Sequence, residues 1–407
     1  MPYYAANVTV GENSFIGAGS VIKRRNNHRQ NVTIGARTVV LQNIEDGKNC
    51  RKKPTKNHQM NIVERHIISH KSAVIEALQR LDELAADANL FVVDDDNKLI
   101  GSLTDGDVRR GLMKGYSLDM PVAVFAKSDP KFLRKGKNGI EDIKLWRGKG
   151  IKIVPIIDGE NHIVDIINFG NQTSLLPMEA VIMAGGLGTR LLPLTENTPK
   201  PLLLVGGKPI IEYNIDRLLT YGISKITISV KHLGQQIVDK FGDGSEKNAH
   251  IHYIFENEPL GTIGAVGEIS DIESEYILVM NSDLLTNIDL EDMFTTLISQ
   301  QGDMIVATTP YHVKVPYGII ESNDGVIVEL KEKPTYTYYS NAGIYMFKKE
   351  VLKYIPKGSF FNATDLMMFM IENQKMVLQF PILGYWLDIG RHEDYAKAQI
   401  DIHHIRF

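Results

Sequence analysis

The sequence has a single cysteine, Cys50, in 407 residues. This scarcity excludes an internal disulfide framework and a cysteine cluster for zinc, and it is typical of the reducing cytoplasm. Long apolar runs are missing too: none reaches the roughly 18 residues that a membrane span needs. The N-terminus MPYYAANVTV has no basic stretch followed by an apolar core. We therefore expect a cytoplasmic protein with no membrane partner.

An excess of charge of one sign is also absent. The chain carries 45 Lys and Arg against 49 Asp and Glu, a formal net charge of -4. Nothing in this balance attracts nucleic acid, so no nucleic-acid partner is expected, and any phosphate must be bound by local groups. With 43% hydrophobic residues, the chain is globular and long enough for two or three domains.

Aliphatic residues recur at every sixth position near the N-terminus. They are Val10, Ile16, Ile22, Ile34 and Val40, with His28 at the missing position. In a left-handed parallel β-helix each triangular coil takes three hexapeptides, so such residues fill the prism. The segment resembles the C-terminal end of hexapeptide-repeat acyltransferases, without the upstream region where their catalytic histidine lies. We expect residues 1–56 to form a short left-handed β-helix segment that packs on the rest of the chain or on another subunit, rather than an acyltransferase.

Two stretches in the middle of the chain align without a gap: VVDDDNKLIGSLTDGD from Val92 and IIDGENHIVDIINFGN from Ile156. Each reads as a strand, an acidic turn and a strand. Apolar residues at helical spacing predict a helix over 72–88, and another helix is expected over 105–112. The order is helix, strand, strand, helix.

This order resembles a tandem cystathionine-β-synthase (CBS) domain, an α+β module that binds adenosine nucleotides in many proteins. We expect it to span residues 57–176. The resemblance implies a regulatory adenine nucleotide at Thr104 and Asp107. The same two residues also fit an N-capped helix with acidic residues in its first turn. The second copy has Asn168 and Asn171 in their place.

From Met178 an apolar strand runs into the glycine-rich turn GGLGTR. The glycines leave backbone N–H groups accessible to a triphosphate. Arg190, directly after the turn, and Lys200, in TPKPLL, bring two cations toward the phosphates, as expected where charge is stabilised during transfer. The spacing is neither that of a dinucleotide fold nor that of a P-loop.

Strand and helix signals then alternate, which predicts a mainly parallel sheet with ligands at the carboxyl ends of its strands. Asp283, in NSD, and Asp388, in WLDIG, come after two such apolar runs. Mg²⁺ takes one or two protein carboxylates and completes its octahedron with phosphate oxygens and water. We therefore expect Asp283 and Asp388 to hold Mg²⁺.

The motifs GGLGTRLLPLTENTPKPLL, EPLGTIGA, NSD, EKP, NAGIY and WLDIG occur in this order. They resemble those of the sugar-phosphate nucleotidyltransferases over residues 177–407. The resemblance implies a Rossmann-like, GT-A-like α/β fold with a mixed sheet flanked by helices, an enzyme that joins a nucleoside triphosphate to a sugar 1-phosphate, and catalytic roles for Arg190, Lys200 and Asp283. It implies nucleotide binding by Gly185, Gly186, Gly188, Thr189, Gly261 and Thr262. It implies sugar-phosphate binding by Tyr317, Gly318, Glu332, Lys333, Asn341 and Gly343.

The loop EPLGTIGA resembles that of mannose-1-phosphate guanylyltransferases, which favours GTP. With the paired CBS module, the chain resembles the glucosamine-1-phosphate guanylyltransferases of bacterial legionaminic acid synthesis, which predicts GDP-glucosamine as the product. GDP-mannose and UDP or dTDP sugars stay open, as does a non-catalytic subunit that senses nucleotide. Because β-helix segments commonly trimerise and tandem CBS repeats commonly pair, we expect a homo-oligomer.

Overall fold

The computed structural model describes residues 62–135 and 140–405, together with eight two-residue strands near the N-terminus. The chain divides into two compact units, residues 1–132 with 155–166 and residues 133–154 with 167–407. No helix in the described part of the chain is both long enough and apolar enough to span a membrane.

The N-terminal strands pair in parallel. They are β1 (Tyr3–Tyr4), β2 (Thr9–Val10), β3 (Phe15–Ile16), β4 (Val21–Ile22), β5 (Asn27–His28), β6 (Thr33–Ile34), β7 (Val39–Val40) and β8 (Asn49–Cys50). In β1 and β4, Tyr3 pairs with Val21, and β4 continues the ladder as Val21 pairs with Val39. These offsets of 18 residues equal three hexapeptides. The side chains of this segment lie outside the described residues, so their packing in a β-helix stays a prediction.

Between residues 62 and 168 the chain forms two small sheets, with strand orders β11-β10-β9 and β12-β13-β14. The helices are α1 (Ile62–His66), α2 (Val74–Leu84), α3 (Asp105–Met113) and α4 (Ile140–Gly148), with 3₁₀ turns at Ala85–Asp87 and Val122–Val124. The strands are β9 (Ile67–Ser69), β10 (Leu90–Val93), β11 (Leu99–Leu103), β12 (Leu133–Arg134), β13 (Ile153–Ile157) and β14 (Ile163–Asn168). The two helices expected around the first copy are therefore present as α2 and α3.

The two aligned copies share one turn geometry. Asp94 Oδ1 accepts hydrogen bonds from the backbone N–H groups of Asp96 and Lys98, both at 2.9 Å. Asp158 Oδ1 accepts the corresponding pair from Glu160 and His162, again at 2.9 Å. The strand–acidic turn–strand pattern is thus confirmed in both copies. The CBS resemblance and its boundaries at 57 and 176 stay predictions, because 57–61 lie outside the described residues and the two units divide the chain differently.

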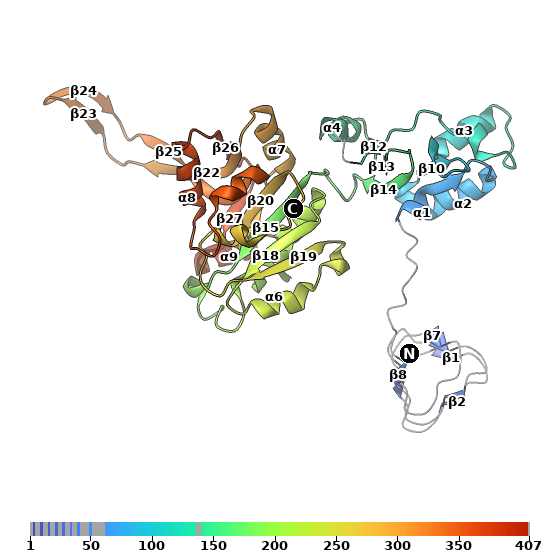
Figure 1. Cartoon of the computed structure of the whole chain (residues 1–407), viewed down its shortest axis with the longest axis horizontal. Coiled ribbons are helices and arrows are strands. Elements are labelled where there is room, and N and C mark those ends of the chain that lie inside the picture. The colour runs from blue at the N-terminus through green and yellow to red at the C-terminus, as the bar shows by residue number, and fades with distance from the viewer. Residues whose placement is uncertain are drawn as a thin grey trace. The chain divides into compact units, whose positions relative to one another are not determined.

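The C-terminal region is built on a seven-stranded mixed sheet (Figure 1). In sheet order its strands are β19 (His250–Phe255), β18 (Lys225–Val230), β15 (Met178–Ala184), β20 (Tyr276–Asn281), β25 (Thr335–Lys348), β22 (Met304–Lys314) and β26 (Val377–Pro381). The first four run parallel, and β25 is antiparallel to both of its neighbours. The expected mixed α/β sheet is therefore confirmed.

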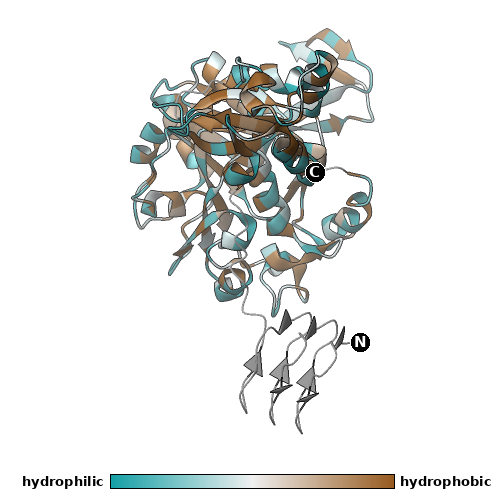
Figure 2. Cartoon of the chain, turned by 90° about the vertical axis from the view of Figure 1, so that its right-hand side faces the viewer, coloured by the Kyte–Doolittle hydropathy of each residue, from teal (hydrophilic) through white to brown (hydrophobic). Residues whose placement is uncertain are grey.

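Helices cover both faces of this sheet, because successive strand residues point to opposite sides. Ile182 of β15 packs with the core under α5 (Ile210–Thr220), α6 (Gly234–Phe241) and α7 (Leu290–Ser299). Val181 packs in the opposite core with α8 (Ala363–Glu372). Figure 2 shows the sheet as the hydrophobic layer between them.

The remaining elements of the region are shorter. They are the strands β16 (Leu204–Val205), β17 (Lys208–Pro209), β21 (Leu284–Thr286), β23 (Ile319–Asn323), β24 (Val326–Lys331) and β27 (Trp386–Asp388), the helix α9 (His392–Asp401), and 3₁₀ turns at Thr189–Leu191, Lys200–Leu202, Ser245–Lys247, Gly264–Glu268 and Lys349–Tyr354. β23 and β24 form a two-stranded hairpin at the end of the ribbon made by β22 and β25, away from the body of the region (Figure 1).

Candidate active site

The glycine-rich turn leaves β15 at the carboxyl end of the parallel strands. A Cβ on Gly185 would lie 2.5 Å from Glu256 Oε1, so any larger residue there would displace the Glu256 carboxylate. Gly188 has φ of 65°, and its carbonyl oxygen accepts a hydrogen bond from Thr195 Oγ1 at 2.9 Å. The turn is therefore held rigidly by its own chain.

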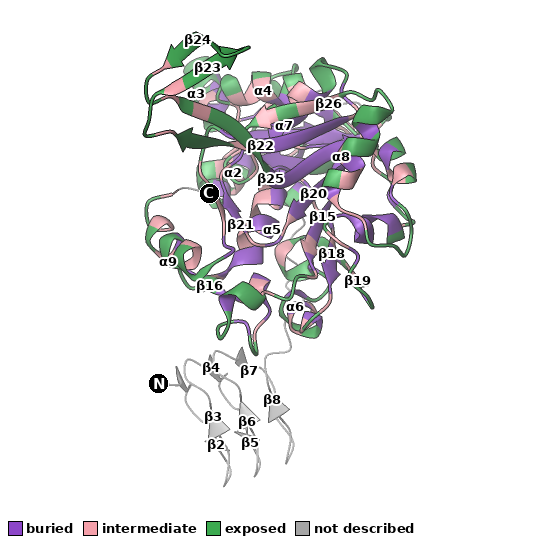
Figure 3. Ribbon diagram, turned by 90° about the vertical axis from the view of Figure 1, so that its left-hand side faces the viewer, coloured by how far each residue is buried: buried purple, intermediate pink, exposed green. Residues whose placement is uncertain are grey.

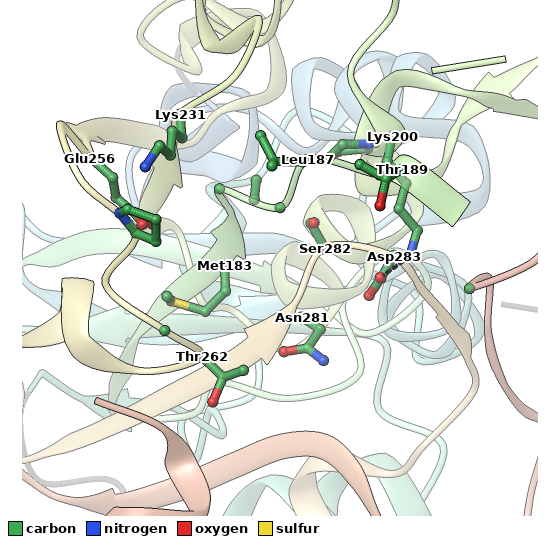
Figure 4. Close-up of a pocket in the computed structure, with 18 of the residues that line it drawn as sticks. Met183, Leu187, Thr189, Lys200, Lys231, Glu256, Thr262, Asn281, Ser282 and Asp283 are labelled. Atoms are coloured by element: carbon green, nitrogen blue, oxygen red, sulfur yellow. Dashed lines mark hydrogen bonds and ion pairs between the residues drawn. The ribbon is translucent and has the colours of Figure 1, made fainter. Parts of the chain in front are cut away.

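A cavity of about 490 Å³ opens beside this turn (Figure 4). That volume is in the range of small-molecule sites. The residues that line it include all nine predicted catalytic and nucleotide-binding residues: Gly185, Gly186, Gly188, Thr189, Arg190, Lys200, Gly261, Thr262 and Asp283. The fold thus brings into one cavity residues that are almost one hundred positions apart.

Two carboxylates lie close to Lys200, which lines this cavity. Lys200 Nζ donates a short hydrogen bond to Asp283 Oδ2 and lies 3.9 Å from Asp388 Oδ1. The small ladder of β21 and β27 pairs Leu284 with Asp388, and Ile389 N–H donates to the carbonyl oxygen of Asp283 at 3.1 Å. These backbone contacts hold the two acidic residues side by side.

The two carboxylates are incompletely satisfied. Asp283 Oδ1 and Asp388 Oδ1 are buried, and neither has a hydrogen-bond partner among the described residues. Burial raises the pKa of Asp388, the nearby Asp283 carboxylate raises it further, and Lys200 and Arg190 oppose the rise. A divalent cation would relieve this repulsion and use the unpaired oxygens. The donor set therefore fits Mg²⁺.

No group of three or more His, Cys, Asp or Glu side chains converges as a metal site within the part of the chain that the structure describes. Two carboxylates suffice for Mg²⁺ when substrate phosphates and water complete its shell. An all-protein cage, as for structural zinc, is not what these residues form.

A second cavity of about 260 Å³ shares Thr262 and Asn281 with the first and is also lined by Asp388. Asn341 and Gly343 line it as well, as expected for the sugar-phosphate end. Asn341 is fixed there, because its side chain donates to Tyr345 at 2.8 Å and accepts from Gly343 N–H at 2.9 Å.

Four predicted sugar-phosphate residues do not join this site. Tyr317 and Gly318 precede β23, and Glu332 and Lys333 come after β24, so all four lie at the base of the terminal hairpin. They line neither cavity. Their role in sugar-phosphate binding stays a prediction.

Thr104 and Asp107 begin α3 and form a capping box. Asp107 Oδ2 accepts from Thr104 Oγ1 at 2.6 Å and from Thr104 N–H at 3.0 Å, while Arg110 donates to Oδ1 at 2.5 Å. Local partners therefore already occupy this carboxylate, and adenine nucleotide binding here stays a prediction.

Gly261 has φ of 78°, and a Cβ there would lie 2.5 Å from the carbonyl oxygen of Phe361. Thr262 Oγ1 accepts from Ala363 N–H at 2.9 Å, at the start of α8. The glycine in this loop is thus required by the chain's own packing, before any ligand is considered.

Sequence reasoning missed Glu256, which lines the first cavity and is 8% exposed. Its Oε1 accepts from Ser229 Oγ and its Oε2 from Leu260 N–H at 3.1 Å. Glu256 comes directly after β19, so it stands at a strand's carboxyl end as Gly185 does. The same end-of-strand rule would have found it.

The fold and the cavity define an α/β protein whose ligand site lies at the carboxyl ends of parallel strands. Residues 179–404 match the family described as nucleotidyl transferase, and the chain belongs to that family.

Three relatives are sugar-1-phosphate nucleotidyltransferases. The chain is 31% identical to D-glycero-alpha-D-manno-heptose 1-phosphate guanylyltransferase of Aneurinibacillus thermoaerophilus, over 56% of this chain and 99% of that protein. It is 28% identical to mannose-1-phosphate guanylyltransferase of Mycobacterium tuberculosis, over 55% of this chain and 64% of that protein. It is 29% identical to UTP–glucose-1-phosphate uridylyltransferase of Synechocystis sp., over 54% of this chain and 62% of that protein. The chain thus spans less than two thirds of the last two proteins.

Proposed function

We propose that this chain transfers a guanylyl group from GTP to a sugar 1-phosphate, forming a GDP-sugar and pyrophosphate. The observation that carries the proposal is the convergence of Lys200 and Asp283, which line the cavity beside the glycine-rich turn, with Asp388, which lines the adjoining second cavity. Glu256 supports the choice of base, and the lining of the second cavity supports the choice of acceptor.

The reaction needs no protein nucleophile. A sugar 1-phosphate is an anion at neutral pH, so one of its oxygens attacks the α-phosphorus of the triphosphate. The bond between the α-phosphorus and the bridging oxygen breaks, and pyrophosphate leaves with the electron pair. Lys200 and Arg190 neutralise the phosphate charge, and the rigid turn positions the triphosphate.

Asp283 and Asp388 are the residues that would hold Mg²⁺. When bound, the ion supplies Lewis-acid charge stabilisation at the phosphate oxygens. Without it, the carboxylates would repel a triphosphate that must lie beside them. Lys200 lies between these carboxylates and the cavity, so its ammonium group can neutralise a substrate phosphate bound beside Asp283.

Glu256 supports guanine as the base. A carboxylate accepts hydrogen bonds and donates none. The Watson–Crick edge of guanine carries two adjacent donors, N1–H and N2–H₂, whereas uracil and thymine place carbonyl oxygens on both sides of a single N–H. Each Glu256 oxygen has one partner from the chain and keeps a lone pair for the ligand. A carboxylate here favours GTP and disfavours UTP and dTTP.

Glutamine at this position tests the assignment, because its amide both donates and accepts. We expect Glu256→Gln to lower kcat/KM for GTP by roughly 10- to 100-fold, the size of one lost base-edge pair, and to raise relative use of UTP or dTTP. Glu258→Gln, an exposed carboxylate in the same loop, is the matched control. Unchanged GTP preference in Glu256→Gln would contradict the role.

For the acceptor we propose glucosamine 1-phosphate, in surface-sugar synthesis of the legionaminic acid type. The amides of Asn281 and Asn341 and the carboxylate of Asp388 line the second cavity and suit sugar hydroxyls and an ammonium group. Mannose 1-phosphate is the alternative among GDP-sugar acceptors.

The deciding experiment is pyrophosphate release with Mg²⁺ across four nucleoside triphosphates and a set of hexose and amino-hexose 1-phosphates. Turnover restricted to GTP with glucosamine 1-phosphate is the expected result. Turnover with another pair replaces the substrates and retains the reaction. A folded protein that is silent across the whole grid contradicts the proposed reaction.

A further inference from the structure

Lys231 is a cation in the first cavity that takes no part in the phosphate chemistry. It comes directly after β18, and it lines the cavity together with Glu256. No ion pair or side-chain hydrogen bond joins Lys231 to another residue in the described part of the chain. Lys200, by contrast, is held by Asp283. The ammonium group of Lys231 is therefore available to a ligand.

The backbone places Lys231 beside Glu256. β18 and β19 run parallel, and Val230 pairs with Phe255 at their carboxyl ends. Glu256 N–H donates to the carbonyl oxygen of Val230 at 2.9 Å, so the pairing continues past the last strand residue. Lys231 and Glu256 are thus the next residues on two neighbouring strands. Side chains at matching positions of parallel strands lie on the same face of a sheet.

The turn that holds Lys231 is rigid. Gly234, which begins α6, donates its N–H to the carbonyl oxygen of Lys231 at 3.2 Å, and a Cβ on this glycine would lie 2.8 Å from Cβ of Val230. Gln236 Nε2 donates to the carbonyl oxygen of Asn197 at 3.0 Å, which ties α6 to the segment after the glycine-rich turn. Val230 is fully buried, and Figure 3 shows the central strands β15 and β20 of the same sheet as buried ribbon. The backbone position of Lys231 is therefore set before a ligand binds.

Lys231 lies at the end of the cavity opposite to the phosphate chemistry. Figure 4 shows Lys231 and Glu256 on one side of Leu187, and Lys200 with Asp283 on the other. Glu256 is the residue assigned to the base, so Lys231 belongs to the base end of the cavity as well. A nucleotide that extends across the cavity presents its base to this pair of residues and its phosphates to Lys200.

Glu256 alone does not distinguish guanine from every other base. A carboxylate accepts hydrogen bonds, and it therefore rejects the carbonyl oxygens of uracil and thymine. Adenine carries a donor, its N6 amino group, which can pair with the same carboxylate. Where adenine has this amino group, guanine has the O6 acceptor, next to N1–H. Separation of GTP from ATP thus requires a hydrogen-bond donor beside Glu256.

We infer that Lys231 reads the O6 and N7 acceptors of the guanine base beside Glu256, and that the two residues together select GTP over ATP. A lysine ammonium has three donors and no acceptor. It pairs with O6 and N7 of guanine, whereas it meets the N6 amino group of adenine donor against donor. O6 and N1–H are adjacent on the ring, which matches the adjacent positions of Lys231 and Glu256. The inference rests on the proposed function, because it takes the base to be guanine.

GTP analogues that each change one base contact test this assignment. 7-deaza-GTP lacks the N7 acceptor, 6-thio-GTP has a weaker acceptor in place of O6, and ITP lacks the N2 amino group. Dissociation constants, measured by titration calorimetry with Mg²⁺ and without a sugar phosphate, keep the test independent of turnover. We expect the wild-type protein to bind 7-deaza-GTP and 6-thio-GTP roughly 10-fold more weakly than GTP.

Lys231→Met keeps an unbranched side chain and removes the charge. We expect it to bind GTP roughly 10- to 100-fold more weakly than the wild type and to bind ATP at least as well. It should lose the penalties for 7-deaza-GTP and 6-thio-GTP and keep the penalty for ITP. Glu256→Gln should show the reverse pattern. Lys231→Arg, which keeps donors for O6 and N7, should keep the preference for GTP over ATP.

Lys240→Met, at an exposed lysine of α6, is the matched control and should bind every nucleotide as the wild type does. The inference is overturned if the penalties for 7-deaza-GTP and 6-thio-GTP persist in Lys231→Met. It is also overturned if this variant loses affinity equally for GTP, ATP and UTP, which is the result of a lost phosphate contact. A wild-type protein that binds UTP or dTTP more tightly than GTP contradicts the proposed function instead, before any variant is compared.

Discussion

Two pairs of polar residues stand out in this chain, Thr104 with Asp107 and Asp283 with Asp388, and they differ in where their partners come from. Thr104 and Asp107 are three positions apart and bond to each other across the first turn of α3. Asp283 and Asp388 come from distant segments, and each keeps a buried oxygen without a hydrogen-bond partner among the described residues. Polar residues that satisfy each other locally stabilise a helix, whereas residues that converge from afar and stay unsatisfied prepare a place for a ligand.

The largest expected effect is at the converging pair. Asp283→Asn and Asp388→Asn should each lower turnover by roughly 10²- to 10³-fold and raise the Mg²⁺ concentration needed for half-maximal rate, because each removes one metal ligand. Chelation of Mg²⁺ should abolish turnover of the wild-type protein. Steady-state rates over a Mg²⁺ titration measure both.

Asp271→Asn, an isosteric change at an exposed carboxylate, is the control for that experiment. The thermal midpoints of all three variants should stay close to wild type. Wild-type turnover in Asp283→Asn would show that the converging pair, like the capping pair, is only structural.

The next largest effect is expected at Gly185, and it should differ from the effect at the adjacent Gly186. A Cβ on Gly185 would collide with Glu256, whereas one on Gly186 meets nothing within 4 Å. Gly185→Ala should therefore destabilise the free protein by about 1–3 kcal/mol, as overpacking does, and lower kcat/KM for GTP by displacing Glu256.

Gly186→Ala should leave the free protein as stable as wild type, within about 0.5 kcal/mol. Any rise in KM for GTP in Gly186→Ala then measures contact with the nucleotide itself. Thermal unfolding and GTP kinetics on the same samples separate the two effects. Equal stability loss in both variants would contradict the geometry of the turn.

The smallest expected effect is at the capping pair. Asp107→Asn should cost about 1–2 kcal/mol locally and leave turnover unchanged. Burial raises the pKa of Asp107, but hydrogen bonds from Thr104 and Arg110 more than offset this, so the pKa lies below its usual range. A lowered folded-state pKa gives stability above the unfolded value, and that stability is lost as the pH falls below about 4.

Hydrogen exchange of the α3 amides, measured at pH 7 and at progressively lower pH, checks this prediction. Protection of α3 should be weaker in Asp107→Asn at pH 7, and the difference from wild type should shrink in acid. If added ATP or AMP protects α3 in the wild type and fails to do so in Asp107→Asn, the carboxylate serves a nucleotide as well as the cap.

The sequence predicts the sheet and the residues of the cavity well. The strands follow from local hydrophobic periodicity, and the cavity follows from the rule that ligands bind at the carboxyl ends of parallel strands. Apolar runs such as YILVMN give strands, and parallel strands place the residues at their carboxyl ends along a common edge. Gly185, Gly261 and Asp283 are therefore found in one cavity. The alternation of Val181 and Ile182 between two cores results from the two-residue period of a strand.

Two features escape such reasoning for physical reasons. Glu256 is a lone carboxylate after an apolar strand. Its position in the cavity is set by contacts with Ser229 and Gly185, which are distant in the sequence and come close to it only in the folded chain. The hairpin of β23 and β24 is the other case. Ile320 and Leu330 read as ordinary strand residues, because a local pattern fixes which face is apolar and leaves open whether any surface of the same chain meets it.

The ladder of β21 and β27 has a consequence for how such a protein can change over time. It fastens Asp283 to Asp388 by backbone pairing, whatever the chain does between Thr286 and Trp386. That interval contains α7, part of the central sheet and the hairpin of β23 and β24. Lengthening or remodelling these parts leaves the spacing of the two carboxylates unchanged. The phosphate chemistry can thus be inherited intact while the segments that face the second cavity diversify by insertion.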